Sequence, residues 1–227
     1  MKAYVWDLPT RLFHWLLVVC VVAAFVTAKM GGAMMVWHGR IGLTIVGLLV
    51  FRLVWGVIGS THARFGQFVR GPAAVLAYLR GAPEGLGHNP LGALSVLALL
   101  GALAAMAGTG LFANDDIAFR GYLAPLVSSD MSNRLTAIHF QIETLLMALV
   151  GLHLAAILFY AFAKKRDLVR PMLTGWAPGD PGQSTKGGGP LAFAIAVIVA
   201  LAAVWAASGA LNPPPPPPPA STGAPNW

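Results

Sequence analysis

Cysteine and charged side chains are both scarce in this chain of 227 residues. The one cysteine, Cys20, lies inside an apolar stretch. This excludes a disulfide within the chain, a cysteine-ligated iron–sulfur cluster and the Cys-x-x-Cys-His motif for covalent haem attachment. Charged residues make up 10% of the chain, against about 25% in a typical soluble domain. Because 57% of the residues are hydrophobic, the composition indicates a membrane protein.

Long apolar stretches account for most of the chain. A helix needs about 20 apolar residues to cross a hydrocarbon core of about 30 Å. Lipid offers the backbone no hydrogen-bond partners, so each crossing stretch must be helical. The stretches near or above this length are Leu12–Ala28, Ile41–Ile58, Leu91–Ala113, Leu135–Ala163 and Leu191–Leu211.

The basic residues are divided unevenly between the two sides of the membrane that these stretches define. With a cytoplasmic N-terminus, eleven Lys and Arg residues lie on or near the cytoplasmic side and four on the opposite side. This bias predicts a multi-pass membrane protein with its N-terminus in the cytoplasm. The net charge of +7 is therefore a feature of topology and does not indicate binding to nucleic acid. The four residues on the far side are Lys29, Arg40, Arg120 and Arg134.

The apolar stretches group into a large first unit and a small C-terminal addition, which predicts an all-α integral membrane fold. We expect residues 1–174 to form a four-helix transmembrane bundle. A Gly/Pro-rich linker, residues 175–190, leads to a fifth C-terminal transmembrane helix at 191–211. Residues 212–227 form a tail with seven consecutive prolines, which is an extended spacer that this topology places in the periplasm.

Four of the six histidines lie in or at the ends of the apolar stretches. His139 and His153 are 14 residues apart, which at about 100° per residue is about 40° short of four full turns. Both imidazoles therefore leave the same face of one helix, with a rise of about 21 Å between them. His38 should lie level with His139 near the outer surface, and His14 level with His153 near the cytoplasmic surface.

Two histidine pairs at two depths suit one kind of cofactor in particular. Each pair can ligate a haem iron from opposite sides with neutral imidazole nitrogens, which predicts two non-covalent b-type haems. A single histidine in a membrane would more often be a hydrogen-bonded packing residue. A metal site of histidine and carboxylate type fits worse, because ligands about 21 Å apart cannot share an ion.

Haem propionates need cationic partners at the membrane edge, and four arginines are candidates. Arg40 and Arg134 lie beside the outer histidine pair, and Arg11 lies beside the inner one. Arg52 follows His38 by 14 residues, so it shares that face at the depth of the inner pair. A charge inside a span is costly unless it is paired, which makes Arg52 a functional candidate. Snorkelling to the headgroups is its alternative role.

Three further polar residues have simpler interpretations. Glu143, one turn below His139, either exchanges protons with a bound quinone or makes a hydrogen bond across the bundle, and we favour the second role. His62 and His88 lie in the cytoplasmic loop and are interpreted as interfacial polar residues. The same loop mixes apolar residues with arginines between 65 and 80, which predicts a short helix lying in the membrane interface.

Several motifs together resemble one family. Trp6–Trp15 (WDLPTRLFHW), Trp37–Gly42 (WHGRIG) and the His-x13-His spacing resemble the bacterial di-haem cytochromes b of the cytochrome b561 group. This group includes the b-type membrane subunit of nickel–iron hydrogenases. The resemblance covers about residues 1–176. Stretches that look like the branch encoded beside periplasmic c-type cytochromes are Phe65–Gly81, Gly87–Leu91, Gly110–Asp116 and Leu168–Gly175.

The resemblance implies that His14, His38, His139 and His153 are the haem ligands. It also implies electron exchange between membrane quinone or quinol and a periplasmic redox partner such as a c-type cytochrome. The protein would then be a redox subunit of an electron-transfer chain rather than a self-contained enzyme. The fifth helix and the proline tail depart from the usual four-helix pattern of the family.

Three other functions remain open at this point. An oxidoreductase that reacts with superoxide or another small molecule would need an exposed outer haem edge lined by cations such as Lys29, Arg120 and Arg134. A haem-free membrane anchor would lack a b-type α band in its reduced-minus-oxidised spectrum. A transporter fits least, because the sequence has no discontinuous helix or repeat pair.

Overall fold

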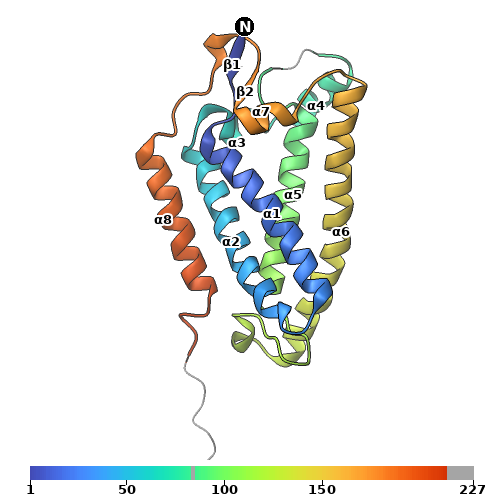
Figure 1. The fold of residues 1–227 in the computed structure, drawn as a ribbon, viewed down its shortest axis with the longest axis vertical. Coiled ribbons are helices and arrows are strands. Elements are labelled where there is room, and N and C mark those ends of the chain that lie inside the picture. Colours follow the sequence, from blue (N-terminus) through green and yellow to red (C-terminus); the bar gives the residue numbers. More distant parts are fainter. Residues whose placement is uncertain (83–84, 214–227) are drawn as a thin grey trace, which may run out of the picture.

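The computed structural model describes residues 1–82 and 85–213, which fold mostly into helices (Figure 1). Among these residues, five helices are long and apolar enough to cross a membrane. The chain is therefore an all-α, multi-pass membrane protein, as its composition predicts. The five helices are α1 (Leu8–Met30), α2 (Met34–Ile58), α5 (Pro90–Gly110), α6 (Ser129–Phe162) and α8 (Pro190–Ala207).

Two of these helices begin with both a polar side-chain cap and a proline. The carboxylate of Asp7 accepts a hydrogen bond from the Thr10 backbone N–H at 2.8 Å and so caps α1. The side chain of Asn89 accepts one from the Gly92 N–H at 2.7 Å and caps α5. A proline follows each cap within the first turn, where its missing N–H costs nothing.

Two helices end three or four residues before the end of the apolar stretch that predicted them. We predicted a stretch ending at Ala113, but α5 ends at Gly110. The stretch that we ended at Leu211 contains α8, which ends at Ala207. In both cases the residues after the helix are apolar or small, so a prediction from hydrophobicity alone places the helix end too late. Of the proline-rich tail expected at 212–227, residues 214–227 lie outside the described part of the chain.

Helices α1, α2, α5 and α6 lie side by side along the long axis of the molecule (Figure 1). Contacts join α1 to α2, α2 to α5, and α5 to α6. Most large apolar side chains point outward, as lipid requires, and the buried ones are concentrated between helices. One buried cluster joins α2, α5 and α6 and consists of Ile45, Leu49, Ala102, Leu103 and Leu146.

Helix α8 packs along α2 on the side away from α6 (Figure 1). Its buried face is built from alanines, Ala196 and Ala200 among them, which allow the two backbones to approach closely. Gly47 of α2 serves the same purpose, because a Cβ there would lie 2.7 Å from a methyl group of Val204. Phe193 of α8 packs edge-on against Trp55 of α2, with ring centroids 6.2 Å apart.

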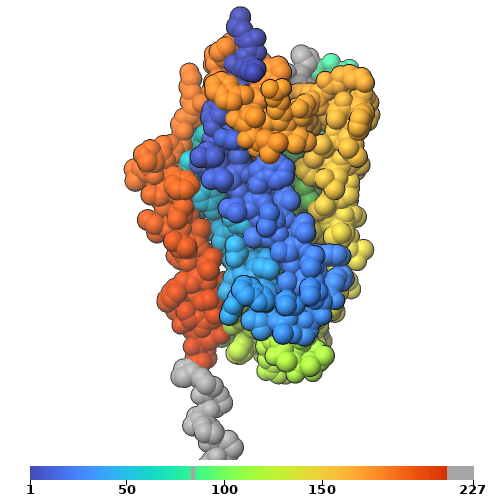
Figure 2. Space-filling view, viewed as in Figure 1, coloured from blue at the N-terminus to red at the C-terminus, as the bar shows by residue number. Residues whose placement is uncertain are grey.

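The linker before α8 folds back onto the N-terminus, which the sequence did not predict. Strand β1 (Lys2–Tyr4) pairs antiparallel with β2 (Trp176–Pro178). Further along the linker, the Thr185 N–H donates to the Tyr4 carbonyl oxygen at 2.6 Å. Figure 2 shows this segment packed beside the N-terminal residues at one end of the molecule. We call this end the N-terminal end of the bundle.

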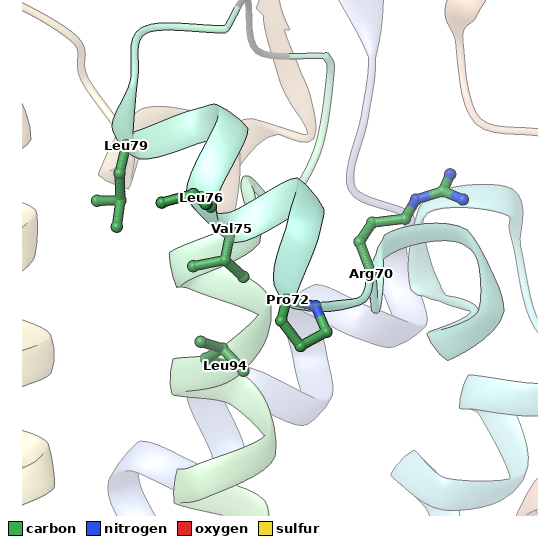
Figure 3. A pocket seen from close by; sticks show the side chains of 6 residues that line it. All are labelled: Arg70, Pro72, Val75, Leu76, Leu79 and Leu94. Carbon is green, nitrogen blue, oxygen red and sulfur yellow. The ribbon is translucent and has the colours of Figure 1, made fainter.

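The loop between α2 and α5 contains two short helices, α3 (Phe65–Phe68) and α4 (Pro72–Leu79), where we predicted one. The chain leaves helix at Val69 and re-enters it at Pro72, which is a favoured first helical residue. An apolar crevice of about 360 Å³ lies between α4 and α5, and the side chain of Arg70 extends away from its leucines (Figure 3). A last short helix, α7 (Val169–Thr174), follows α6.

Candidate functional site

His38 and His139 face each other at the end of the bundle opposite the N-terminus, and we call them the outer pair. Their ring centroids are 6.2 Å apart and their planes are 83° apart. A histidine nitrogen binds a transition metal at about 2 Å. Two imidazoles on opposite sides of one metal ion therefore have centroids roughly 6 Å apart, since each centroid lies about 1 Å behind its nitrogen. The separation of the outer pair fits that arrangement.

Backbone carbonyls fix the orientation of both rings in the outer pair. Nδ1 of His38 lies 2.9 Å from the carbonyl oxygen of Ala24, and Nδ1 of His139 lies 2.9 Å from that of Met106. A carbonyl oxygen only accepts hydrogen bonds, so each Nδ1 carries the proton and donates it. Nε2 of each ring then keeps its lone pair, which is the state that a metal ligand needs.

Two glycines make room around the outer pair. Gly110 ends α5 against the ring of His139, where a Cβ would lie 2.9 Å from Cε1 and 3.3 Å from Nδ1. Gly39 follows His38, and a Cβ there would lie 2.9 Å from the ring of Phe119. The loop that carries Phe119 therefore packs directly beside His38.

His14 of α1 and His153 of α6 come together nearer the N-terminal end, and we call them the inner pair. Each side chain is partly buried, and the two rings lie close enough to interact electrostatically. Nδ1 of His14 is buried and has no hydrogen-bond partner among the described residues. The bundle thus places His38 against His139, and it places His14 near enough to His153 for an electrostatic interaction.

Arg52 of α2 is buried instead of extending to the surface, because only 3% of its area is exposed. Its guanidinium carbon lies 4.6 Å from the centroid of the Phe65 ring, a cation–π contact. The negative charge of Asp7 acts on it from the start of α1. The other oxygen of Asp7, which does not cap α1, accepts a hydrogen bond from Nε1 of Trp55 at 3.0 Å.

Buried polar atoms without partners gather at the N-terminal end. Eight such side-chain atoms occur in the described chain, and seven of them are on this side of the molecule. Three of the seven belong to arginines: Arg11 Nε, Arg52 Nη1 and Arg64 Nε. Leaving a buried donor unsatisfied costs about 1–3 kcal/mol. A group of buried cationic donors fits an anionic ligand such as a haem propionate.

The other predicted residues have different surroundings. Arg40 lies over the ring of Trp37 at 5.0 Å and is exposed, and Arg134 is exposed as well. Nη1 of Arg11 donates to the carbonyl oxygen of Leu173 at 2.6 Å, so part of its guanidinium anchors α7. These three arginines have the charge that a propionate needs, but each is more exposed to solvent than Arg52.

Glu143 pairs with Lys29 across the bundle, with 2.7 Å between Oε1 and Nζ. This contact joins α6 to α1, which agrees with the structural role that we favoured for the carboxyl group. It also neutralises one of the cations on the outer side. Within residues 1–82 and 85–213, no group of three or more His, Cys, Asp and Glu residues is arranged to hold a metal ion.

A family model for the prokaryotic cytochrome b561 matches residues 5–175 of this chain. The match covers all four helices that carry or adjoin the histidine pairs. The chain belongs to the prokaryotic cytochrome b561 family. Members are transmembrane b-type cytochromes of electron transfer, so this protein binds b-type haem. No curated protein and no solved structure matches the chain.

Three residues of this cytochrome b561 site escaped sequence reasoning. From the sequence we assigned no role to Asp7 or Gly110, and we interpreted His88 as an interfacial residue. Their roles arise from contacts between segments far apart in the chain, such as Asp7 with Trp55. Only the Ser/Thr/Asp/Asn rule for helix caps could have singled out Asp7.

Replacing Asp7 tests whether it stabilises the N-terminal end by its charge as well as by capping. We expect Asp7→Ala to lower the free energy of unfolding by at least about 1 kcal/mol through the lost cap, and further because buried Arg52 loses a negative charge that acts on it. Asp7→Asn retains a good cap but not the charge, so its loss should be smaller. Thermal unfolding in detergent, followed by circular dichroism, measures both. Wild-type melting of both variants would contradict the assignment.

Proposed function

We propose that this protein is a transmembrane di-haem cytochrome b that transfers electrons between the quinone pool and a periplasmic redox partner, most simply a c-type cytochrome. The observation that carries the proposal is the presence of two histidine pairs at two levels of one bundle. His38 and His139 would ligate one haem iron, and His14 and His153 the other. Bound haem supplies the one-electron chemistry that the side chains lack.

The protein's own contribution is to hold and orient these ligands. The carbonyl oxygens of Ala24 in α1 and Met106 in α5 accept hydrogen bonds from Nδ1 of His38 and His139. Nε2, on the other side of each ring, is then directed away from the helix that supplies the carbonyl. Gly110 leaves space for the ring of His139. At the inner level, the guanidinium of Arg52 would compensate a propionate charge. The apolar helix faces around both levels exclude water.

The distribution of basic residues supports a cytoplasmic N-terminal end in the bacterial inner membrane. Most of them belong to the loops and termini at this end, including the segments around α3, α4 and α7. Positive charge is retained on the cytoplasmic side during insertion. The outer pair would then face the periplasm, next to the loop that carries Phe119, and the C-terminal tail would be periplasmic.

We assign residues 1–174 to the haem-binding domain and treat the rest as an addition to it. The family match ends at residue 175, at the start of the linker. Helix α8 contacts α2 from outside the group of helices that carry the histidines. Its buried alanine face and its exposed outer leucines suit a helix that lies between the bundle and lipid. The chain would thus be a four-helix domain with a fifth helix packed on its side.

Electron transfer between the two proposed partners can be measured in proteoliposomes. With a reduced quinol in the bilayer and an oxidised c-type cytochrome outside, we expect reduction of the cytochrome that depends on the reconstituted protein. Each quinol releases two electrons and two protons, so two molecules of a single-haem acceptor should be reduced per quinol. Reduced cytochrome with oxidised quinone tests the reverse direction. No transfer in either direction, in protein that contains haem, would contradict this choice of partners.

A further inference from the structure

His88 is held by the turn that leads into α5. Gly87 has φ +91°, a left-handed conformation that suits glycine, and a Cβ there would lie 3.3 Å from Nδ1 of His62. Asn89 then caps α5. Between these two fixed residues, the side chain of His88 is directed into the N-terminal end of the bundle.

Aromatic rings surround the imidazole of His88. Its centroid lies 4.4 Å from that of Phe68 and 4.7 Å from that of Trp6. Nδ1 is buried and has no hydrogen-bond partner among the described residues. Burial lowers the pKa of His88 to about 3, with the nearby charge of Arg52 adding to the effect. The ring is therefore neutral at physiological pH, with one N–H to donate.

Arg52 reaches the same region from α2. Its Nη1 also lacks a partner, although the residue is almost completely buried. The guanidinium stacks on Phe65, whose ring centroid is 5.7 Å from that of Phe68, the neighbour of His88. The carboxylate of Asp7, which interacts with Arg52 electrostatically, already accepts hydrogen bonds from Thr10 and Trp55. Two buried side-chain nitrogens thus share an apolar region, and neither has a hydrogen-bond partner within residues 1–82 and 85–213.

We propose that His88 and Arg52 together bind one carboxylate, a propionate of the haem that His14 and His153 would hold. The inference rests on the proposed function. A carboxylate has two oxygens and can accept from both Nδ1–H and Nη1–H. Because Trp6, Phe65 and Phe68 keep water away, these charge-assisted bonds are stronger than they would be at the surface. Arg52 lies at the depth of His153, since each follows an outer histidine by 14 residues.

Compensating a propionate charge should raise the reduction potential of the inner haem. A negative charge near the iron favours the oxidised state, which carries one more positive charge. Loss of the His88 hydrogen bond would therefore make reduction harder. We expect His88→Leu to lower the equilibrium constant for reduction of the inner haem about tenfold, which for one electron corresponds to a shift of about 59 mV.

A set of three variants separates this role from general packing. His88→Asn keeps an N–H group near the position of Nδ1 and should recover most of the wild-type potential. Arg52→Gln should lower the same potential, and the double variant should show less than the sum of the two shifts if both residues bind one group. His62→Leu is the matched control, because its Nε2 pairs instead with the Gln183 carbonyl oxygen at 3.0 Å.

Redox titration of the purified protein, followed by optical spectroscopy, gives both haem potentials. The proposal predicts that the inner potential falls in His88→Leu and Arg52→Gln while the outer potential stays constant. Unchanged potentials with two haems bound would overturn it and leave the proposed function intact. A raised KM for quinol with unchanged potentials would overturn it in favour of a quinone contact. Protein that contains no haem would refute the proposed function itself.

Discussion

Replacing His38 or His139 by alanine should reduce the haem content of the purified protein from two per chain to one. Both rings of the outer pair are oriented by backbone carbonyls, and either one alone would provide only one of the two histidines proposed to hold this haem. The inner pair lies about 21 Å away along α6, so it should be unaffected. The remaining haem should therefore retain the wild-type inner potential.

Extraction and quantification of haem per chain measures this result, with optical redox titration to identify which haem remains. The matched control is His62→Ala, because this loop histidine belongs to neither pair. The corresponding changes at His14 or His153 should remove the inner haem and leave the outer one. Loss of both haems, or of neither, in any single variant would show that the histidines are paired wrongly.

Gly110→Ala should have nearly the same effect on the outer haem without changing any ligand. A Cβ at this position would lie 2.9 Å from Cε1 of His139, closer than real Cβ contacts allow. The ring would have to move, and its bond to the Met106 carbonyl would be strained. Small displacements of a ligand are costly, so the proposed outer haem should be lost or weakened.

The matched control for this change lies two residues earlier in the same helix. Gly108→Ala meets no atom within 4 Å of its new methyl group, so we expect two haems per chain. Alanine is preferred over glycine within a helix by about 1 kcal/mol, so neither variant should lose helix stability. A Gly110→Ala protein that keeps its outer haem at the wild-type potential would contradict the close fit around His139.

The sequence predicted the spanning helices well because length and hydrophobicity decide them. The histidine pairs could also be anticipated, since a spacing of 14 residues returns to the same helix face whatever the rest of the fold does. The ends of α5 and α8 were placed wrongly, at Ala113 and Leu211, because apolar loop residues extend the hydrophobic stretches. Hydrophobicity reports depth in the membrane and not the position of a helix cap.

Contacts between distant segments could not be predicted from local pattern. The pairing of Lys2–Tyr4 with Trp176–Pro178 joins the two ends of the family-matched region, and neither strand has a distinctive sequence. The burial of His88 depends on Phe68 and Trp6, which come from separate segments. From sequence alone, a polar loop residue such as His88 is interpreted as exposed, because the distant residues that bury it are not known.

The haem content of the unmodified protein tests the central claim most directly. Pyridine haemochrome spectra of the purified chain, set against its protein concentration, give the number and type of haems per molecule. The account predicts two b-type haems, both removable by acidified organic solvent because Cys20 offers no covalent attachment motif. One haem per chain, or none, would contradict the claim that the bundle holds a cofactor at each of two levels.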